Sequence, residues 1–316
     1  MNTQRETSPF HPGEQHVQSL TGVREVMEAR GRQMIRDHMP DQHRDFFATL
    51  PFIVIGALDA GGHPWATVMA GPPGFMDSPD ARSLHLNAGL LADDPLASHW
   101  QAGMQLGLLG IQPHTRRRNR MNGVLTRVNE FGSTVAVRQS FGNCPKYIQP
   151  REAFWVPDAR PPLGVLGPAF QDEGAHLSPR AQALIEQADT FFIASASPNA
   201  SARDLDRSEG VDVSHRGGLS GFVKLRDEAE GTLLTVPDYT GNAMFNTLGN
   251  IVSNPKVGLL FMDFERGALL WLQGLAEVEH DSPEQAEHTG ALRLLRIRVT
   301  RGRLHERGWP LAWSED

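Results

Sequence analysis

The sequence predicts a mainly β protein of the α+β class, built from two tandem copies of one small β-barrel with short flanking helices. Short runs rich in Val, Ile and Leu, broken by Gly, Pro and Asp, fill residues 52–137 and are typical of antiparallel strands. A proline-rich stretch over residues 157–168 separates this region from a second one that repeats the order of helix and strand. Landmarks in the two regions keep the same spacing, which indicates a duplication.

Composition sets the class of protein. The 316 residues are 40% hydrophobic and 21% charged, which is enough for two domains with their own cores. No apolar run approaches the roughly 20 residues of a membrane span, and a net charge of −7 gives no overall attraction to nucleic acid or anionic lipid. The N-terminus lacks the features of a secretory signal, and the single cysteine, Cys144, cannot form an internal disulfide. We therefore expect a cytoplasmic protein without membrane or nucleic-acid partners.

The elements follow in order along the chain. Residues 21–39 have helical spacing, with Val23, Met27, Met34 and Ile35 as apolar positions, and predict one leading helix. The segment FIVIGALDAGGHPWATVMAG predicts a hairpin, and SPRAQALIEQADTFFIASASP predicts a helix followed by a strand. The predicted divisions are a helical lead at 1–48, a first barrel at 49–156, a linker at 157–178 and a second barrel at 179–316.

The two barrels align in several places. FIVI at 52–55 matches FFIA at 191–194, and GPPGF at 71–75 matches GLSGF at 218–222. GLLG from Gly107 matches GLLF from Gly258, and Gly123 of MNGVL matches Gly274 of LQGLA. Each copy is expected to carry a short helix before its GLL strand. The closing strands, TVAVRQSFGNCPKY and RIRVTRGRLHER, correspond in order.

The copies differ where an anion would bind. In this alignment Ser214 faces Thr67 and Arg216 faces Met69, so only the second copy has the cation. The second copy also has four polar residues near a predicted helix start, where backbone N–H groups favour anions: Asn242, Asn246, Thr247 and Asn250. The first copy has the acidic segment ADDPLASHW there, and we expect its two aspartates to repel a phosphate. The alternative is a surface hairpin whose arginine is solvated.

The first copy instead has a basic strand, RRRNRMNGV, after its GLL run. Alternation places Arg118, Arg120 and Asn122 on one face and Arg117 and Asn119 on the other. A nucleic-acid patch, a solvated edge strand and a contact to a phosphate held by the other copy are the three alternatives.

These segments resemble the FMN-binding split-barrel family of pyridoxamine 5′-phosphate oxidases, in particular its two-barrel flavin-nucleotide-binding proteins. The resemblance runs from Phe52 to the C-terminus and is carried by FGNCPKYIQPR, DVSHRGGLSGFV, PDYTGN and NPKVGLLF. It implies two tandem split β-barrels with FMN between them, a small-molecule substrate and a homodimer.

The resemblance also implies site residues. The positions that match the family's phosphate site are Ser214, Arg216, Asn246 and Thr247, with Asn242 beside them. RRNRMNG matches a family strand that reaches FMN from the other barrel, which implies Arg117, Arg118 and Arg120. The family's arginine and lysine at the helix start are replaced here by Asn246 and Thr247. RLHER is similar to a family segment that holds the substrate, which implies Arg303 and His305.

The expected function is an FMN-dependent oxidoreductase acting on a small molecule, with NADH or NADPH as reductant. No catalytic residue is identified, because a flavin performs the electron transfer and the protein orients it. No hydrolase elbow, Walker loop or zinc motif is present in the sequence, and no metal site is predicted. Cys144 is expected to be a small filler on a strand. The alternatives are a flavin-binding or sequestering protein without turnover, and a purely structural barrel pair.

Overall fold

Two antiparallel sheets with the same strand order form the body of the chain. The computed structural model describes residues 7–157, 170–202, 204–306 and 309–314. The first sheet contains β1 (Phe52–Leu58), β2 (Pro64–Ala70), β3 (Met76–Asp77), β4 (Ser83–Leu86), β5 (Gln105–Gln112), β6 (Arg117–Asn129) and β7 (Gly132–Gly142). The second contains β10 (Thr190–Ala196), β11 (Val211–Gly217), β12 (Lys224–Glu228), β13 (Gly231–Tyr239), β14 (Lys256–Met262), β15 (Leu269–Glu279) and β16 (Ala291–His305).

The strand orders are β2-β1-β5-β6-β7-β4-β3 and β11-β10-β14-β15-β16-β13-β12. If the seven strands of each sheet are numbered separately along the chain, the two orders are identical. Both sheets also have a register shift at the same place, between Asn122 and Gly123 in β6 and between Gln273 and Gly274 in β15. The mainly β class is confirmed, and the shared topology supports the duplication. Most of the predicted linker, residues 158–169, lies outside the described residues.

One strand register differs from the sequence alignment. Gly56 of β1 pairs with Gly107, and Ala194 of β10 pairs with Gly258. Gly56 therefore corresponds to Ala194, so the aligned FIVI and FFIA runs are displaced by one residue. Almost every side chain of these two strands is buried, and a strand buried on both faces has no polar alternation that could fix its register.

The helices also differ from the prediction. Instead of one helix over residues 21–39 there are three leading helices: α1 (Pro12–Leu20), α2 (Arg24–Met34) and α3 (Asp41–Thr49). Gly22, with φ +71°, lies at the break between α1 and α2. In the second half, α4 (Pro179–Gln187) precedes β10 and α5 (Asn246–Ser253) precedes β14, as predicted. The first half has only a 3-10 turn, η1 (Ala97–His99), before β5.

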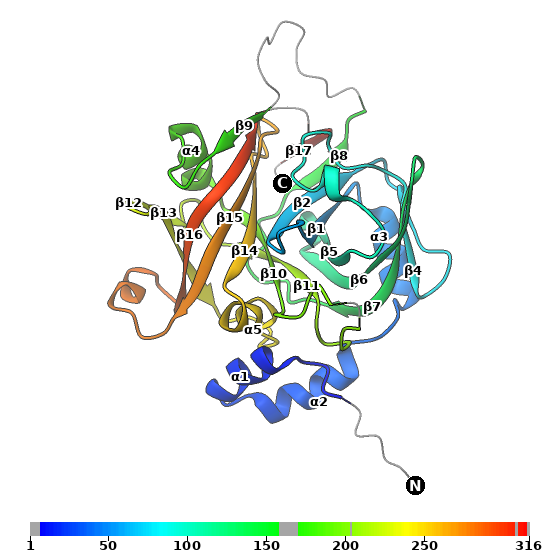
Figure 1. The fold of residues 1–316 in the computed structure, drawn as a ribbon, viewed down its shortest axis with the longest axis horizontal. Coiled ribbons are helices and arrows are strands. Elements are labelled where there is room, and N and C mark those ends of the chain that lie inside the picture. The colour runs from blue at the N-terminus through cyan, green and yellow to red at the C-terminus, as the bar shows by residue number, and fades with distance from the viewer. Residues whose placement is uncertain (1–6, 158–169, 203, 307–308, 315–316) are drawn as a thin grey trace, which may run out of the picture.

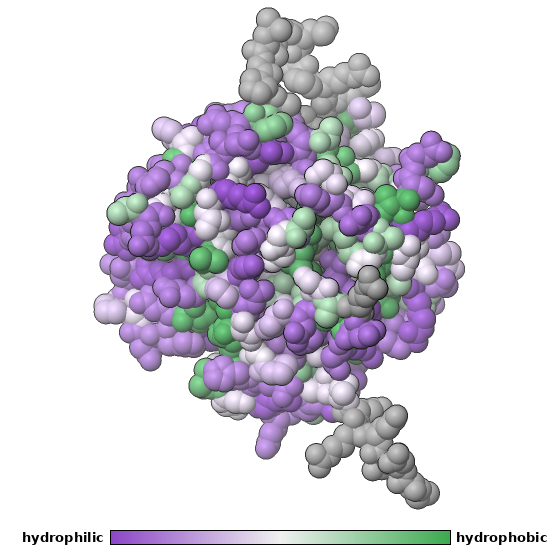
Figure 2. Space-filling view, in the orientation of Figure 1, coloured by the Kyte–Doolittle hydropathy of each residue, from purple (hydrophilic) through white to green (hydrophobic). Residues whose placement is uncertain are grey.

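The remaining elements are short. The 3-10 turns η2 (Pro113–Thr115) and η3 (Pro283–Glu287) lie in connections, and β9 (Phe170–Glu173) adds to β16. β8 (Glu152–Trp155) pairs with β17 (Leu311–Ser314) near the C-terminus. Figure 1 shows β8 and β17 at one end of the molecule and α1 and α2 at the other, below α5. Figure 2 shows mostly hydrophilic residues on the same face, with hydrophobic ones scattered among them. No helix within the described ranges is both long and apolar enough to cross a membrane.

The two halves meet through their GLL strands. A Cβ on Gly107 would lie 2.8 Å from the backbone of Asp212 in β11, and a Cβ on Gly258 would lie 2.5 Å from the carbonyl oxygen of Pro64 in β2. Only glycine allows such close backbone contact. The same motif therefore brings β5 against β11 and β14 against β2, and each half approaches the other in an equivalent way.

Candidate functional site

A cavity of about 310 Å³ lies where the first half meets the second. Its walls come from β6 and the segment after β7 on one side, and from β11, β13, α5 and β16 on the other. The lining side chains that carry a charge are Arg118, Arg120, Lys146, Arg216, Asp238 and Arg293. Five of these six are cationic, so the cavity suits an anionic ligand even though the whole chain is acidic.

Arg120 joins the two halves at one wall of the cavity. It is 3% exposed, and its Nη1 donates to Asp212 Oδ1 at 3.1 Å and to Asn246 Oδ1 at 2.9 Å. Its Nη2 donates to the hydroxyl of Ser214, which also accepts a hydrogen bond of 3.0 Å from Thr247. We call these five residues the Arg120 cluster. Two elements of the second half, β11 and α5, thus hold one guanidinium of β6 in place.

Arg118 lies beside this cluster, and among the residues that the structure describes it has no acidic partner. Its Nε donates to the carbonyl oxygen of Cys144 at 2.7 Å, and its Nη1 lies 3.0 Å from His215 Nδ1. Because Arg118 is the donor, His215 must be neutral with its proton on Nε2. Burial and then repulsion by Arg118 lower the pKa of His215 well below its usual value. Burial, with repulsion from Arg120, also lowers the pKa of Arg118 to about 10, so the group stays cationic at neutral pH.

A second pair of arginines that line the cavity shares one carboxylate. Arg216 Nη1 donates to Asp238 Oδ1, while Arg293 Nε lies 3.4 Å from Asp238 Oδ2. The side chains of Asp238 and Arg293 are each 6% exposed. Arg216 Nε and Arg293 Nη1 are buried without a hydrogen-bond partner in the described structure. These unpartnered N–H groups are donors that a ligand could satisfy.

The start of α5 adds backbone donors. No side chain caps this helix, and the residue at the cap, Phe245, has a left-handed backbone with φ 61°. The first N–H groups of an uncapped helix have no intrahelical acceptor and favour anions. Asn246 and Thr247 of the first turn line the cavity, and Asn242 lines it from the preceding loop, where its Oδ1 accepts from Met244 N at 3.1 Å.

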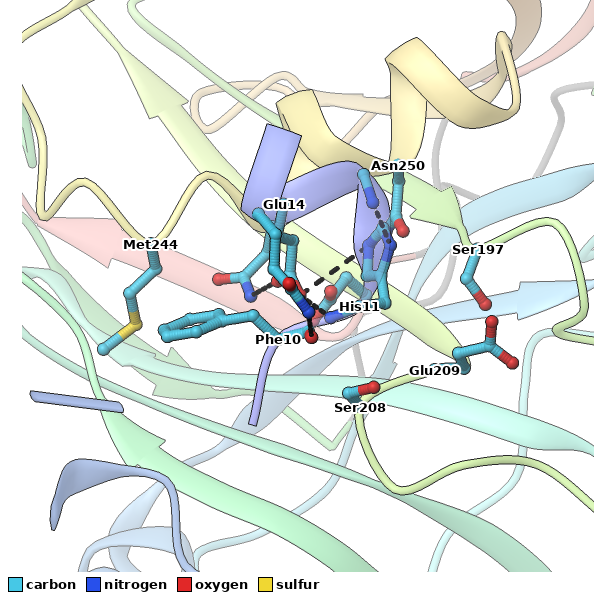
Figure 3. A network of polar contacts seen from close by, with 12 residues as sticks. Phe10, His11, Glu14, Ser197, Ser208, Glu209, Met244 and Asn250 are labelled. Atoms are coloured by element: carbon cyan, nitrogen blue, oxygen red, sulfur yellow. Dashed lines mark hydrogen bonds and ion pairs between the residues drawn. The ribbon is translucent and has the colours of Figure 1, made fainter. Parts of the chain in front are cut away.

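The N-terminal helix supports the start of α5 from outside the cavity. Glu14 Oε2 accepts from the backbone N–H of His11 at 2.8 Å in a capping box, and Glu14 Oε1 accepts from Asn246 Nδ2. Figure 3 shows His11 and Glu14 at the start of α1, with Asn250 of α5 beside His11. Burial, together with the charge of Asp212, raises the pKa of Glu14 well above its usual value. This shift favours the neutral form of Glu14, which would add no negative charge behind the cationic wall.

Most of the residues predicted for the cofactor are brought together by the fold. Seven of the eight line this cavity: Ser214, Arg216, Asn242, Asn246, Thr247, Arg118 and Arg120. Arg117 does not, because neighbouring residues of a strand point to opposite faces. Its Nη2 donates to Gln42 O at 2.6 Å, and its guanidinium lies 4.2 Å from the centre of the Phe46 ring. Arg117 is therefore not among the residues that line this cavity.

The two predicted substrate contacts lie elsewhere. Arg303 lines a separate pocket and pairs with Asp172 at 3.0 Å, and His305 lies 2.7 Å from Asp93. Neither residue lines the cavity between the halves. The C-terminal end of β16, at His305, contacts Asp93 of the first half and not the cavity. The structure therefore does not support Arg303 and His305 as contacts of a ligand in this cavity.

Two further residues were not recognised correctly. Cys144 follows β7 in a loop rather than on a strand, where its carbonyl oxygen orients Arg118. No sequence pattern pointed to Arg293. It is one of three arginines in ALRLLRIRV, and an arginine at such a position is ordinary for an alternating strand. Only the long-range pairing of β16 with β13, which sets Arg293 opposite Asp238, brings Arg293 to the cavity.

Comparison with known proteins gives matches among solved structures only. No family model matches the chain, and no curated protein matches it. HupZ from Group A Streptococcus aligns at 16% identity and a TM-score of 0.31, covering 42% of this chain and 97% of that one. A candidate pyridoxamine 5′-phosphate oxidase from Lactobacillus delbrueckii aligns at 14% identity and a TM-score of 0.31, covering 40% and 93%. HutZ from Vibrio cholerae, described as a heme storage protein, aligns at 14% identity and a TM-score of 0.28, covering 42% and 96%.

Proposed function

We propose that the chain binds FMN in the cavity between its two halves and acts as an FMN-dependent oxidoreductase on a small molecule. One observation carries this proposal: Arg118 and Arg120 of the first half meet Ser214, Asn246 and Thr247 of the second half in one cavity. A cofactor phosphate there would be held from both halves at once.

The residues fit a phosphate in charge and in donors. Arg118 has no carboxylate partner within the described residues, and Arg120 Nε and Arg216 Nε are buried without hydrogen-bond partners. An uncompensated buried cation is unfavourable, and a phosphate dianion would compensate it. The N-terminus of α5 offers further backbone donors. The cavity of about 310 Å³ is within the range of cofactor pockets, at its lower end.

Two aromatic residues of the cavity lining suit a planar ring. The rings of Tyr147 and Tyr239 stack there with centroids 5.2 Å apart and an angle of 29° between their planes. Burial raises the pKa of both phenols, so both stay neutral and can present their faces to an aromatic system. Bound FMN would supply hydride or electron transfer, while this chain would bind it, orient it and exclude water.

A flavin-binding protein without turnover is the second candidate. The carboxylates closest to the cavity, Asp212 and Asp238, are each paired with arginine. Paired carboxylates are poor general bases, since the nearby cations favour their ionised form. We retain NADH or NADPH as the proposed reductant, and a homodimer as the proposed assembly.

The first experiment is an absorbance spectrum of the purified protein, with mass analysis of any molecule that is released on denaturation. Flavin absorbance near 450 nm and the mass of FMN would support the proposal. The matched test is titration of ligand-free protein with FMN and with riboflavin, which lacks the phosphate. We expect FMN to bind about 100-fold more tightly or better, given the number of charge-assisted hydrogen bonds available. Protein that gains no flavin absorbance with added FMN would contradict it. Anaerobic reduction by NADH or NADPH, followed by reoxidation with candidate acceptors, separates the enzyme from the binding protein.

A further inference from the structure

Arg293 is a buried cation of the cavity that neither the family resemblance nor the Arg120 cluster explains. It lies opposite Asp238 in the pairing of β16 with β13, and its guanidinium is 5.2 Å from the centre of the Phe245 ring. It is 5% exposed and lines the cavity. Its Nε and Nη1 have no hydrogen-bond partner in the described part of the chain.

The charges around Arg293 do not balance. Asp238 is the only acidic residue that pairs with it in the described structure, and Asp238 also accepts a short hydrogen bond from Arg216. Two guanidinium groups therefore share one carboxylate, and Arg293 has the longer contact, at 3.4 Å. The Phe245 ring compensates only weakly, since a cation over an aromatic face contributes about 0.5–2 kcal/mol. The wall is left with one excess positive charge.

The backbone around this charge is unusual. Tyr147, Ala243 and Phe245 all have left-handed backbones, with φ of 64°, 61° and 61°. All three line the cavity. Non-glycine residues in this region are uncommon and concentrate at ligand sites, where the surrounding structure imposes the conformation. The Phe245 ring lies under the guanidinium of Arg293, and Tyr147 lines the same cavity.

We propose that Arg293 binds the oxyanion of the small-molecule substrate, so that the substrate carries a carboxylate or a phosphate. Its contacts differ from those of the Arg120 cluster, where we place the cofactor phosphate. Arg293 comes from β16, with its charge over Phe245, whereas Arg120 comes from β6 and bonds Ser214 of β11. The proposal rests on the proposed function only in calling the bound molecule a substrate, since the excess charge of Arg293 is a property of this chain alone.

The test uses three probes and three variants of the full chain. The probes are benzoate, inorganic phosphate and benzyl alcohol, which is a neutral analogue of benzoate. The variants are Arg293→Met, Arg293→Lys and, as a matched control on the same strand, Arg298→Met. Arg298 pairs with Glu228 at 3.0 Å and does not line the cavity. Arg293→Met should fold, because Asp238 keeps Arg216 as its partner. Binding is measured by calorimetry, both without FMN and with FMN at saturation, and the FMN affinity of each variant is measured separately.

We expect wild type and Arg298→Met to bind one of the two oxyanions more tightly than benzyl alcohol. Arg293→Met should lower the affinity for that oxyanion about 10- to 100-fold, as expected for a charge-assisted hydrogen bond. Its affinity for benzyl alcohol should equal that of wild type. Arg293→Lys should restore part of the affinity. The oxyanion with the higher affinity names the substrate class.

Equal oxyanion affinity in wild type and Arg293→Met, or no oxyanion binding by wild type, would overturn the proposal. A further variant, Arg118→Met, gives the loss of FMN affinity expected for a residue that binds the cofactor phosphate. An equally large loss of FMN affinity in Arg293→Met would also overturn the proposal, because it would assign Arg293 to that phosphate. If wild type binds no FMN, the proposed function fails, but the titrations of FMN-free protein still decide the role of Arg293.

Discussion

The indole N–H of Trp271 donates to the hydroxyl of Thr67 across the two halves, over 3.1 Å. The duplication relates this pair to the pair Arg120 and Ser214. Thr67 of the first half corresponds to Ser214 of the second half, and Trp271 of the second half corresponds to Arg120 of the first half. Ile55 pairs with Thr67 as Ile193 pairs with Ser214. The duplicated fold therefore contains two equivalent positions between its halves, one with a guanidinium and the other with an indole.

Thr67 passes the hydrogen bond on to a carboxyl group. Its hydroxyl donates to Asp94 Oδ2, and Asp94 Oδ1 accepts from the backbone N–H of Leu96 at 2.8 Å. Trp271 is fully buried and Asp94 is nearly so. At this position an indole and a buried carboxyl group therefore stand where the other site has a guanidinium, and the carboxyl group disfavours an anion.

The first prediction is a stoichiometry of one FMN per chain. A symmetric pair of barrels would offer two sites, but the second has Trp271 and Asp94 where the first has Arg120 and its hydrogen-bond partners. The measurement is the ratio of released flavin to protein at saturation, with protein concentration determined by amino-acid analysis. A ratio near two would show that the position of Trp271 opens to admit a ligand.

The second prediction compares two neighbouring arginines on β6. Arg118→Met removes a cation that has no carboxylate partner and lines the cavity, and should weaken FMN binding roughly 10- to 100-fold. Arg117→Met removes an arginine that contacts Gln42 and Phe46 on the other face, and should leave FMN affinity unchanged. Titration by quenching of flavin fluorescence measures both.

The two variants change the net charge equally, so a general electrostatic effect would weaken both to the same extent. Equal losses would contradict the assignment of Arg118 to the cavity. Riboflavin serves as the ligand control, since its affinity should respond much less to Arg118→Met than that of FMN.

Much of this arrangement could be predicted because the duplication made the chain its own comparison. The GLL strands and the two aligned glycine turns fixed which strands correspond, and alternation on β6 placed Arg118 and Arg120 on one face. The polar residues Asn246 and Thr247 at a predicted helix start could be placed in the candidate site, and both line the cavity, since helix starts carry free N–H groups wherever they occur.

The remainder depends on contacts between distant segments. Arg293 reaches the cavity only because β16 brings it opposite Asp238, and Glu14 reaches Asn246 only because α1 packs on α5. Neither contact leaves a local pattern. The RLHER segment shows the opposite case. Its residues fit a motif and were expected to contact the substrate, but β16 places Arg303 beside Asp172 and His305 beside Asp93.

The third prediction concerns the pH dependence of stability at Asp94. Burial raises the pKa of Asp94 from 3.8 to about 7. A carboxyl whose pKa is raised on folding stabilises the protein fully below its ordinary pKa, and this contribution is lost as the pH rises toward the folded value. Between pH 4 and pH 7 the free energy of unfolding of wild type should therefore fall by roughly 2–4 kcal/mol relative to that of Asp94→Asn, because the asparagine does not titrate.

Urea unfolding of both proteins across this pH range gives the measurement, and the difference between them cancels the other titrating groups. The absolute stability of Asp94→Asn is not the readout, since an amide satisfies Thr67 and Leu96 differently. Glu230→Gln, which alters an exposed carboxyl, is the control and should follow wild type. A constant difference between Asp94→Asn and wild type over this range would show that Asp94 is ionised in the folded protein.

The last prediction tests how α1 supports the cavity. A Cβ on Gly13 would lie 2.2 Å from the carbonyl oxygen of Gly249 and 2.3 Å from Ser253 Oγ, both on α5. An exposed Gly→Ala change in a helix normally stabilises it by about 1 kcal/mol. Here we expect the opposite sign, because the added methyl forces the two helices apart, at a cost of about 1–3 kcal/mol.

Gly13→Ala should therefore increase hydrogen exchange over residues 12–20 while the exchange of the two sheets stays as in wild type. Release of α1 also withdraws Glu14 from Asn246, so FMN affinity should fall although no cavity residue has changed. His16→Ala, at an exposed position of the same helix, is the matched control and should leave both measurements as in wild type. If Gly13→Ala slows exchange in α1, the close contact with α5 does not exist in solution. If exchange rises but FMN affinity does not fall, α1 packs as described but does not position Asn246 for the ligand.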